Sequence, residues 1–325
     1  MRILSKFTVV GTQHAAPLQL GEPSRLPALH AQAAGRWLAA SALVCTLLLV
    51  AMGGVVRATG HGLGCPDWPL CYGRIVPPAL TGAWVEFTHR LLGAVTTLQI
   101  LLLGLVAWRG RRDPARPAWP ALAAVGAASA VALQVLLGGL HVVLEIPPVT
   151  GLVHTVTAML IVGLLAWHLA AGRPARGGSA ERPRLLGAWL AVTAIAALLL
   201  VVSGSYVTRS GASLACPDFP ACGAPAAVAR GPVHVQVMHR FLALAVALLL
   251  AVALAWLWRS EAGHGLRGLA LGLAVLLLAQ GGLGAANVLL RLPIWSRVLH
   301  LAAASTLWAG LAFLWGSYTT REDRG

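Results

Sequence analysis

Long apolar stretches, separated by short polar segments, dominate the chain. Leu, Ala, Val and Gly fill them, without the alternation of polar and apolar residues that a transmembrane barrel requires. Each stretch approaches or exceeds the roughly 20 residues with which an α-helix crosses a bilayer, and a helix satisfies its backbone hydrogen bonds internally in lipid. The pattern predicts eight transmembrane helices, over residues 37–56, 84–108, 118–140, 150–171, 186–207, 233–258, 268–290 and 297–317.

The composition narrows the class of protein. Hydrophobic residues make up 58% of the 325 residues, charged residues only 10%, and the mean hydropathy is +0.77. A soluble globular chain carries roughly 25% charged residues, so an ordinary soluble enzyme, a secreted disulfide scaffold and a disordered chain are excluded. A net charge of +14 could indicate nucleic acid, but the basic residues lie between the apolar stretches. We expect an all-α polytopic protein in a lipid bilayer, with no nucleic-acid partner.

The basic residues also predict the orientation of the chain. Sixteen Lys and Arg lie on one side of the predicted spans and six on the other, while Arg90 and Arg240 lie inside spans. Cytoplasmic segments carry the excess of positive charge. We therefore expect both termini in the cytoplasm, and residues 65–71 and 216–222 outside, in a multi-pass protein of the cell membrane. The apolar run near the N-terminus is too short for a signal peptide, so residues 1–36 are expected to form a cytoplasmic tail.

The second half of the chain repeats motifs of the first half. The heptapeptide CPDWPLC at 65–71 recurs 151 residues later as CPDFPAC, with five identical positions, and the dipeptide His89-Arg90 recurs 150 residues later as His239-Arg240. Gly-Gly-Leu precedes a histidine in both halves, at 138–140 before His154 and at 281–283 before His300. In this alignment His141 has no histidine counterpart, because Gly284 follows the second tripeptide.

This repeat predicts the domain organisation. Four spans separate the repeated motifs, so both halves cross the membrane in the same direction, as two tandem four-helix bundles related by a pseudo-two-fold axis along the membrane normal. The expected parts are the tail 1–36, an N-terminal half 37–171, a cytoplasmic linker 172–185, a C-terminal half 186–317 and a cytoplasmic tail 318–325.

Four histidines lie at repeated positions near the outer ends of even-numbered spans: His89, His154, His239 and His300. Ionisable residues inside a membrane are costly and usually functional, and two imidazoles from facing helices can hold a haem between them. One such histidine alone would more often be a helix-end residue, but packing gives no reason for histidine at all four positions. Zinc is a weaker alternative, since neither pair has further ligands at suitable spacing. The sequence predicts two haem sites.

Three charged residues lie next to these histidines. Arg90 and Arg240 are candidates to pair with haem propionates, although snorkelling to the headgroups explains them equally well. Glu86 shares a helical face with His89, and its counterpart in the second half is Gln236. A carboxylate beside a porphyrin can move protons, which glutamine cannot; the alternative is an acid favoured by the helix N-terminus. We favour a functional role for Glu86, because an acid at membrane depth is expensive.

Four of the five cysteines form two pairs in the outer loops, Cys65 with Cys71 and Cys216 with Cys222. The predicted topology places them in an oxidising compartment, where such loops can close as disulfides. A thiol redox pair and metal binding are alternatives, although zinc-type Cys-x-x-Cys spacing is absent. We expect disulfides, structural at least in the second half.

These motifs resemble the haem A synthase family. Gly54-Val-Val-Arg-Ala-Thr-Gly60 and the following Gly-Leu-Gly-Cys-Pro-Asp-Trp-Pro-Leu-Cys71 resemble its first outer loop, and Glu86-Phe-Thr-His-Arg90 resembles its second-helix motif. The resemblance covers about residues 37–317, and the two cysteine pairs are more typical of the bacterial branch. It implies an enzyme that oxidises a ring methyl of haem O to a formyl group, by two hydroxylations and a dehydration, to make haem A for cytochrome oxidase.

The resemblance also implies roles for particular residues and partners. A resident haem b would be held by His239 and His300, and the substrate haem O by His89 and His154. Glu86 would be the catalytic carboxylate, and the disulfide of the first loop would contribute to activity. The implied partners are haem O synthase and an electron donor, for which quinol is a candidate.

One function of another class competes with this interpretation. A bis-histidine membrane cytochrome b that transfers electrons from quinol, without modifying its haem, would use the same two histidine pairs, and Glu86 could then accept a proton from quinol. A porphyrin transporter is a weaker competitor, because it would show broken helices and polar residues at the midplane.

Overall fold

The computed structural model describes residues 26–111, 118–171, 183–223 and 231–319. These ranges contain eight long helices and no strand. The helices are α1 (Leu26–Ala58), α2 (Thr81–Gly110), α3 (Trp119–Val143), α4 (Pro148–Ala171), α5 (Arg184–Arg209), α6 (Pro232–Arg259), α7 (Arg267–Leu289) and α8 (Ile294–Thr319). Each contains a segment long and apolar enough to cross a membrane. The chain is a multi-pass membrane protein, and the predicted eight spans are confirmed.

The helix ends lie within three residues of the predicted ones, except at the start of α1. This helix begins at Leu26, eleven residues before the predicted span. The extension is rich in alanine, which favours helix whatever the surroundings. It belongs to the predicted tail 1–36, whose first 25 residues lie outside the described ranges. Most of the predicted linker 172–185 and of the C-terminal tail 318–325 lies outside them too.

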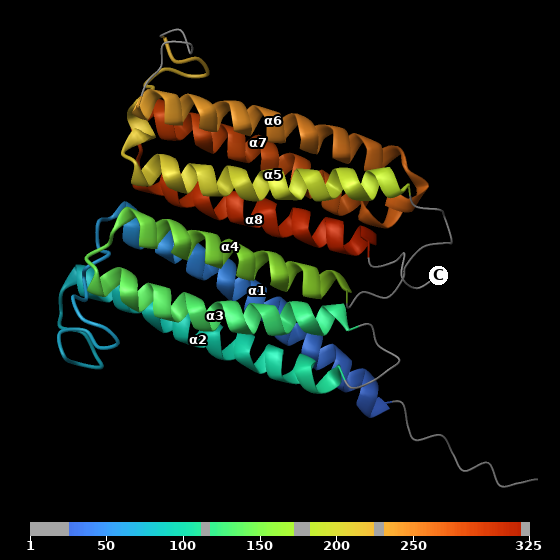
Figure 1. Ribbon diagram of the computed structural model, residues 1–325, viewed down its shortest axis with the longest axis horizontal. Coiled ribbons are helices and arrows are strands. Elements are labelled where there is room, and N and C mark those ends of the chain that lie inside the picture. The colour runs from blue at the N-terminus through green and yellow to red at the C-terminus, as the bar shows by residue number, and fades with distance from the viewer. Residues whose placement is uncertain (1–25, 112–117, 172–182, 224–230, 320–325) are drawn as a thin grey trace, which may run out of the picture.

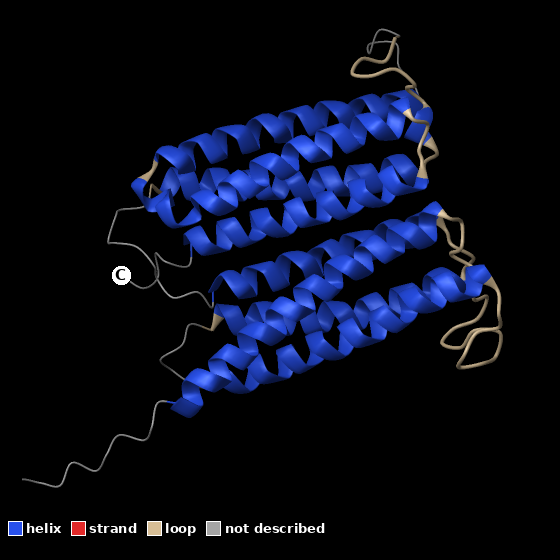
Figure 2. Cartoon of the chain, turned by 180° about the vertical axis from the view of Figure 1, so that it is seen from behind, coloured by secondary structure: helices blue, strands red, loops and turns tan. Residues whose placement is uncertain are grey.

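The helices form two groups of four, α1–α4 and α5–α8, which lie side by side (Figure 1, Figure 2). Helix α8 joins the groups by packing against α4 and α1, and α5 also contacts α4. At this seam the indole nitrogen of Trp308 on α8 donates to the carbonyl of Met159 on α4, at 2.8 Å. The indole lies against Gly163, where a Cβ would come within 2.6 Å of the ring. A glycine therefore allows the close contact between the two groups.

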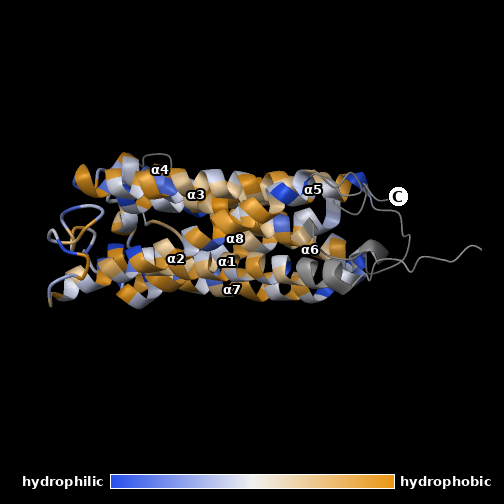
Figure 3. Ribbon diagram, turned by 90° about the horizontal axis from the view of Figure 1, so that it is seen from below, coloured by the Kyte–Doolittle hydropathy of each residue, from blue (hydrophilic) through white to orange (hydrophobic). Residues whose placement is uncertain are grey.

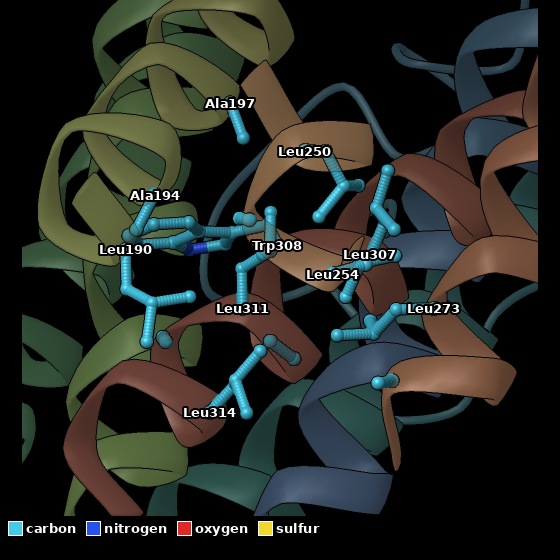
Figure 4. Close-up of a cluster of buried hydrophobic side chains, with 14 of the residues drawn as sticks. Leu190, Ala194, Ala197, Leu250, Leu254, Leu273, Leu307, Trp308, Leu311 and Leu314 are labelled. Atoms are coloured by element: carbon cyan, nitrogen blue, oxygen red, sulfur yellow. The ribbon is translucent and has the colours of Figure 1, made fainter. Parts of the chain in front are cut away.

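Apolar side chains fill the core and also cover the outside. Figure 4 shows the indole of Trp308 packed beside Leu190 and Ala194 of α5, in the main buried cluster. Figure 3 shows that hydrophobic residues continue along the outer surfaces of the helices. Leu98 and Leu278, for example, are 69% and 77% exposed. An apolar surface of this extent suits lipid better than water.

Both cysteine loops lie at one end of the molecule, opposite the end at which α1 begins and α8 ends (Figure 1). We call this the disulfide-loop end. Cys65 and Cys71 are bonded in the connection from α1 to α2, and Cys216 and Cys222 in the connection from α5 to α6. The predicted pairing of the cysteines is confirmed.

The turns from α3 to α4 and from α7 to α8 share contacts at one common spacing along the chain. Residues 145–146 have positive φ, and so do residues 291–292, which follow 146 positions later. A side-chain hydrogen bond closes each turn, from His141 to Thr150 in the first (2.7 Å) and from Ser296 to Asn287 in the second (2.8 Å). The corresponding residues of the two bonds, His141 with Asn287 and Thr150 with Ser296, are also 146 positions apart. Helices α7–α8 therefore match α3–α4 at that spacing.

The alignment of the Gly-Gly-Leu tripeptides at 138–140 and 281–283 is therefore wrong by three residues. It placed His141 opposite Gly284, whereas the residue in the equivalent contact is Asn287. Small and apolar residues recur by chance in lipid-facing helices, so a tripeptide of this kind defines no register. A hydrogen bond between two particular side chains does.

Candidate functional site

Each of the four predicted histidines lies against a glycine on the preceding helix. A Cβ added to that glycine would lie 3.1–3.4 Å from the Cε1 atom of the imidazole, closer than most real Cβ contacts. The pairs are Gly53 with His89, Gly138 with His154, Gly204 with His239 and Gly284 with His300. Any larger residue would have to displace the ring. The missing side chains thus make room for an imidazole between neighbouring helices at four places.

The structure brings the histidines together in the two predicted pairs. His89 on α2 and His154 on α4 lie within electrostatic range of each other in the first group, and His239 on α6 and His300 on α8 do so in the second. Each lies about two turns inside its helix, counted from the disulfide-loop end. His141 stacks on His154, with ring centroids 6.4 Å apart.

The Nδ1 atom of His239 has a hydrogen-bond partner that the other three histidines lack. The Nδ1 atoms of His89, His154 and His300 are buried without a hydrogen-bond partner among the described residues. His239 differs, because its Nδ1 lies 2.8 Å from the hydroxyl of Ser203. The position 151 residues before Ser203 is Met52, which offers no comparable group. One histidine of the second group is therefore oriented by a hydrogen bond that its counterpart lacks.

These residues fit a haem. A buried polar atom without a partner costs about 1–3 kcal/mol, so apolar packing alone does not explain imidazoles at these positions. Iron in a porphyrin needs only two protein ligands, one on each face. No group of three His, Cys, Asp or Glu residues that could hold a bare metal ion occurs in the described parts of the chain. The bond from His239 to Ser203 is of the kind that orients a metal-binding imidazole, leaving Nε2 for the metal.

The carboxylate of Glu86 is buried and fully engaged. Its Oε2 accepts a hydrogen bond from the backbone N–H of Cys65 (2.9 Å), and its Oε1 accepts from the guanidinium of Arg90, one helical turn further on (2.5 and 3.1 Å). Gln236, at the equivalent place in α6, contacts only the carbonyl of Ser213 (3.4 Å). In the first group the carboxylate thus ties α2 to the disulfide loop, which the sequence did not suggest.

Arg90 and Arg240 also hold the loops. Arg90 donates to the carbonyls of residues 65, 67 and 70, and Arg240 donates to those of residues 216, 218, 220 and 221. Each guanidinium is therefore surrounded by loop carbonyls. If Arg90 or Arg240 paired with haem propionates, the propionates would have to compete with these loop carbonyls.

The first disulfide loop folds back over the first group. The indole of Trp68 lies on Gly139 of α3, next to the glycine that faces His154, and a Cβ at Gly139 would come within 2.8–3.0 Å of the ring. Asp67 accepts hydrogen bonds from the backbone N–H groups of Tyr72 and Gly73 (2.6 and 2.7 Å). These bonds, that of Gly73 foremost, lower the pKa of the Asp67 carboxyl. The loop is thus internally braced and covers the end of α3.

Comparison with known proteins assigns the family. Residues 35–312 match the family described as cytochrome oxidase assembly protein. The chain belongs to this family. The match extends from α1 to α8 and so includes both histidine pairs.

The chain is similar to several named proteins. It is 26% identical to a heme A synthase of Shewanella oneidensis, over 86% of this chain and 96% of the relative. A heme A synthase of Symbiobacterium thermophilum is 32% identical, over 82% of this chain and 90% of the relative. A protoheme IX farnesyltransferase of Thermus thermophilus is also 32% identical, over 87% of this chain. This chain covers 48% of that relative, about half its length.

Proposed function

We propose that this protein is a haem A synthase, which oxidises a ring methyl of haem O to the formyl group of haem A. The observation that carries the proposal is the presence of two half-buried histidine pairs, each ring against a glycine and three of the four with a buried, unpartnered Nδ1 atom. Relatives that match this chain over most of both lengths bear the name heme A synthase.

The two pairs have different roles in this proposal. His239 and His300 hold a resident haem b, and His89 and His154 receive haem O. The hydroxyl of Ser203 supports the first assignment, because it orients His239 permanently, as suits a cofactor that stays bound. Neither histidine of the first group has such a restraint on its Nδ1, whereas the second group has one, on His239.

When bound, the haems supply the redox chemistry, in which two hydroxylations and a dehydration convert the methyl to the formyl group. The protein's part is to bind, orient and exclude water. Glu86 is proposed as the carboxylate that takes part in the reaction. Its bonds to Cys65 and Arg90 hold it in place, and Gln236 cannot act in the same way in the second group.

The proposed arrangement has two similar halves, 37–171 and 186–317, related by a pseudo-two-fold axis along the membrane normal. It is supported by contacts that recur at fixed spacing, such as Gly53 with His89 and, 150–151 residues later, Gly204 with His239. We place the disulfide-loop end outside the cell membrane and both termini in the cytoplasm. The excess of basic residues in the segments at the opposite end supports this orientation.

The substrate implies a partner that makes it. A Thermus relative of about twice the matched length is named protoheme IX farnesyltransferase, and we propose that a separate enzyme of that activity, a haem O synthase, supplies haem O to this chain. A quinol is a candidate for the electron donor.

Extraction of haems from membranes tests the function directly. The protein is produced with and without a source of haem O, and the extracted haems are analysed by mass spectrometry. We expect haem A only when the protein is produced together with a source of haem O. Haem b should be found with and without that source. Haem b alone under all conditions would contradict the proposal and favour a bis-histidine cytochrome b.

A further inference from the structure

Three arginines meet at the seam between the two helix groups, at the disulfide-loop end: Arg57 of α1, Arg209 of α5 and Arg297 of α8. All three are half-buried, and Arg57 lies within electrostatic range of the other two. One guanidinium nitrogen of Arg297 donates to the carbonyl of Ala58, at 3.1 Å, which ties α8 to the end of α1. The cluster therefore contains residues of both groups.

No acidic side chain neutralises this cluster. In the described ranges the ion pair that forms is the one between Arg90 and Glu86. The guanidinium of Arg57 has no hydrogen-bond partner there, and that of Arg209 donates only from Nε to the hydroxyl of Ser205 (3.3 Å). A single arginine at a helix end can reach the headgroups alone, but three that converge between helices repel one another. An anion between them would remove that repulsion and use their free N–H donors.

The cluster lies one helical turn outward from the first histidine pair. Arg57 follows Gly53 by four residues on α1, and Gly53 faces His89. The guanidinium of Arg209 lies over Gly151 of α4, so closely that a Cβ at that glycine would overlap it. Gly151 precedes His154 by three residues, and Arg209 is within electrostatic range of His154. Arg209 thus borders His154, and Arg57 lies one helical turn from the glycine that faces His89.

We propose that Arg57 and Arg209 bind the propionates of the porphyrin held by His89 and His154. The inference rests on the proposed function, because it takes the first group as the haem O site. Two carboxylates on one edge of a planar ring match two guanidinium groups one turn beyond the ring's axial ligands. Arg90 lies nearer in sequence to a ligand, but loop carbonyls and Glu86 already surround it.

The proposal also explains why the groups are joined at this end. Arg209 belongs to the second group, so the first site is complete only when α5 packs against α4. The position in α5 that corresponds to Arg57 is Thr208, 151 residues later. The second group therefore has no arginine at that position.

The test compares a porphyrin that has propionates with one that lacks their charge. Purified protein that retains its resident haem is titrated with iron protoporphyrin IX, and separately with its dimethyl ester, while the absorbance shift of bis-histidine ligation is followed. Binding to the first site is identified by its loss in His154→Ala. We expect the parent to bind the free acid more tightly than the ester. Arg57→Gln and Arg209→Gln should each weaken free-acid binding by roughly tenfold or more and leave ester binding unchanged.

Arg291→Gln is the matched control, because Arg291 is an exposed arginine at the same end of the molecule. It should change neither affinity. Equal weakening of both porphyrins in the Arg57 and Arg209 variants, or equal affinities in the parent, would overturn the inference. Native mass spectrometry could also overturn the inference. It would do so if the parent carried a phospholipid that these variants lose, while the variants still preferred the free acid. If one of these results is obtained and the parent still makes haem A, the inference fails and the proposed function survives. If the parent binds no second porphyrin at all, the inference and the proposed function both fail.

Discussion

At the scale of single residues, Glu86 combines a position next to a proposed iron ligand with a structural contact. Its pairing with Arg90 at i+4 is a standard helical ion pair and could have been predicted from the sequence. Its bond to the N–H of Cys65 could not, because the loop conformation that brings Cys65 to α2 is not encoded in a simple spacing. The carboxylate thus also has a structural contact, its bond to the disulfide loop. A variant is needed to separate this contact from a part in the reaction.

Glu86→Gln should abolish most haem A formation while the protein still inserts and binds haem b. Glutamine is nearly isosteric, can still accept the bond from the N–H of Cys65, and occupies the equivalent position 236. Arg90 would keep its bonds to three loop carbonyls, so the loop should hold. Loss of one acid–base group costs about 10²- to 10⁴-fold in rate, which haem extraction and mass spectrometry would detect.

The matched control for this variant is Arg90→Gln, which removes the same ion pair but keeps the carboxylate. If the carboxylate itself takes part in the reaction, Arg90→Gln should retain more activity than Glu86→Gln, although it also removes the bonds to the loop. Haem A formation at the parent rate by Glu86→Gln would refute the assignment. Loss of haem b or of insertion would instead give Glu86 a structural role.

At the scale of helices, the sequence predicts the spans and the histidines but not their packing partners. Apolar length alone determines the eight helices, and recurrence alone singles out His89, His154, His239 and His300. The facing glycines could not be assigned in advance, because glycine is common in these helices and only the packing selects Gly53 or Gly284. The same reason explains the three-residue error in aligning α7 with α3.

The two helix pairs that carry the histidines should be separable by mutation. His239→Ala or His300→Ala should remove the haem b absorbance from the purified protein, because each deletes one ligand of the resident haem. His89→Ala or His154→Ala should leave most of that absorbance and abolish haem A formation. Visible spectra and haem extraction of the four variants, with Arg291→Gln carried through as an unaffected surface substitution, make the comparison. Equal loss of haem b from all four would contradict the division of roles.

At the scale of the whole molecule, the seam between the groups is the feature furthest from the sequence. Met159 and Trp308 are 149 residues apart, yet they form the hydrogen bond that joins α4 to α8. Arg57, Arg209 and Arg297 come from three separate helices and become a cluster only when the groups pack. Such contacts depend on how two similar halves dock, which no periodicity within either half encodes.

The orientation of the whole molecule gives the last prediction. Both disulfide loops lie at one end (Figure 1), and the six basic residues on that side against sixteen on the other predict that this end lies outside. After reduction of intact cells, a membrane-impermeant thiol reagent should therefore label Cys65, Cys71, Cys216 and Cys222. The label should be located by peptide mass spectrometry, and Cys45, half-buried within α1, provides the internal control that should stay unlabelled. Without reduction the four loop cysteines should not react, because they are paired. If they react only in inverted vesicles, the disulfide-loop end faces the cytoplasm, and the positive charge of this chain does not determine its orientation.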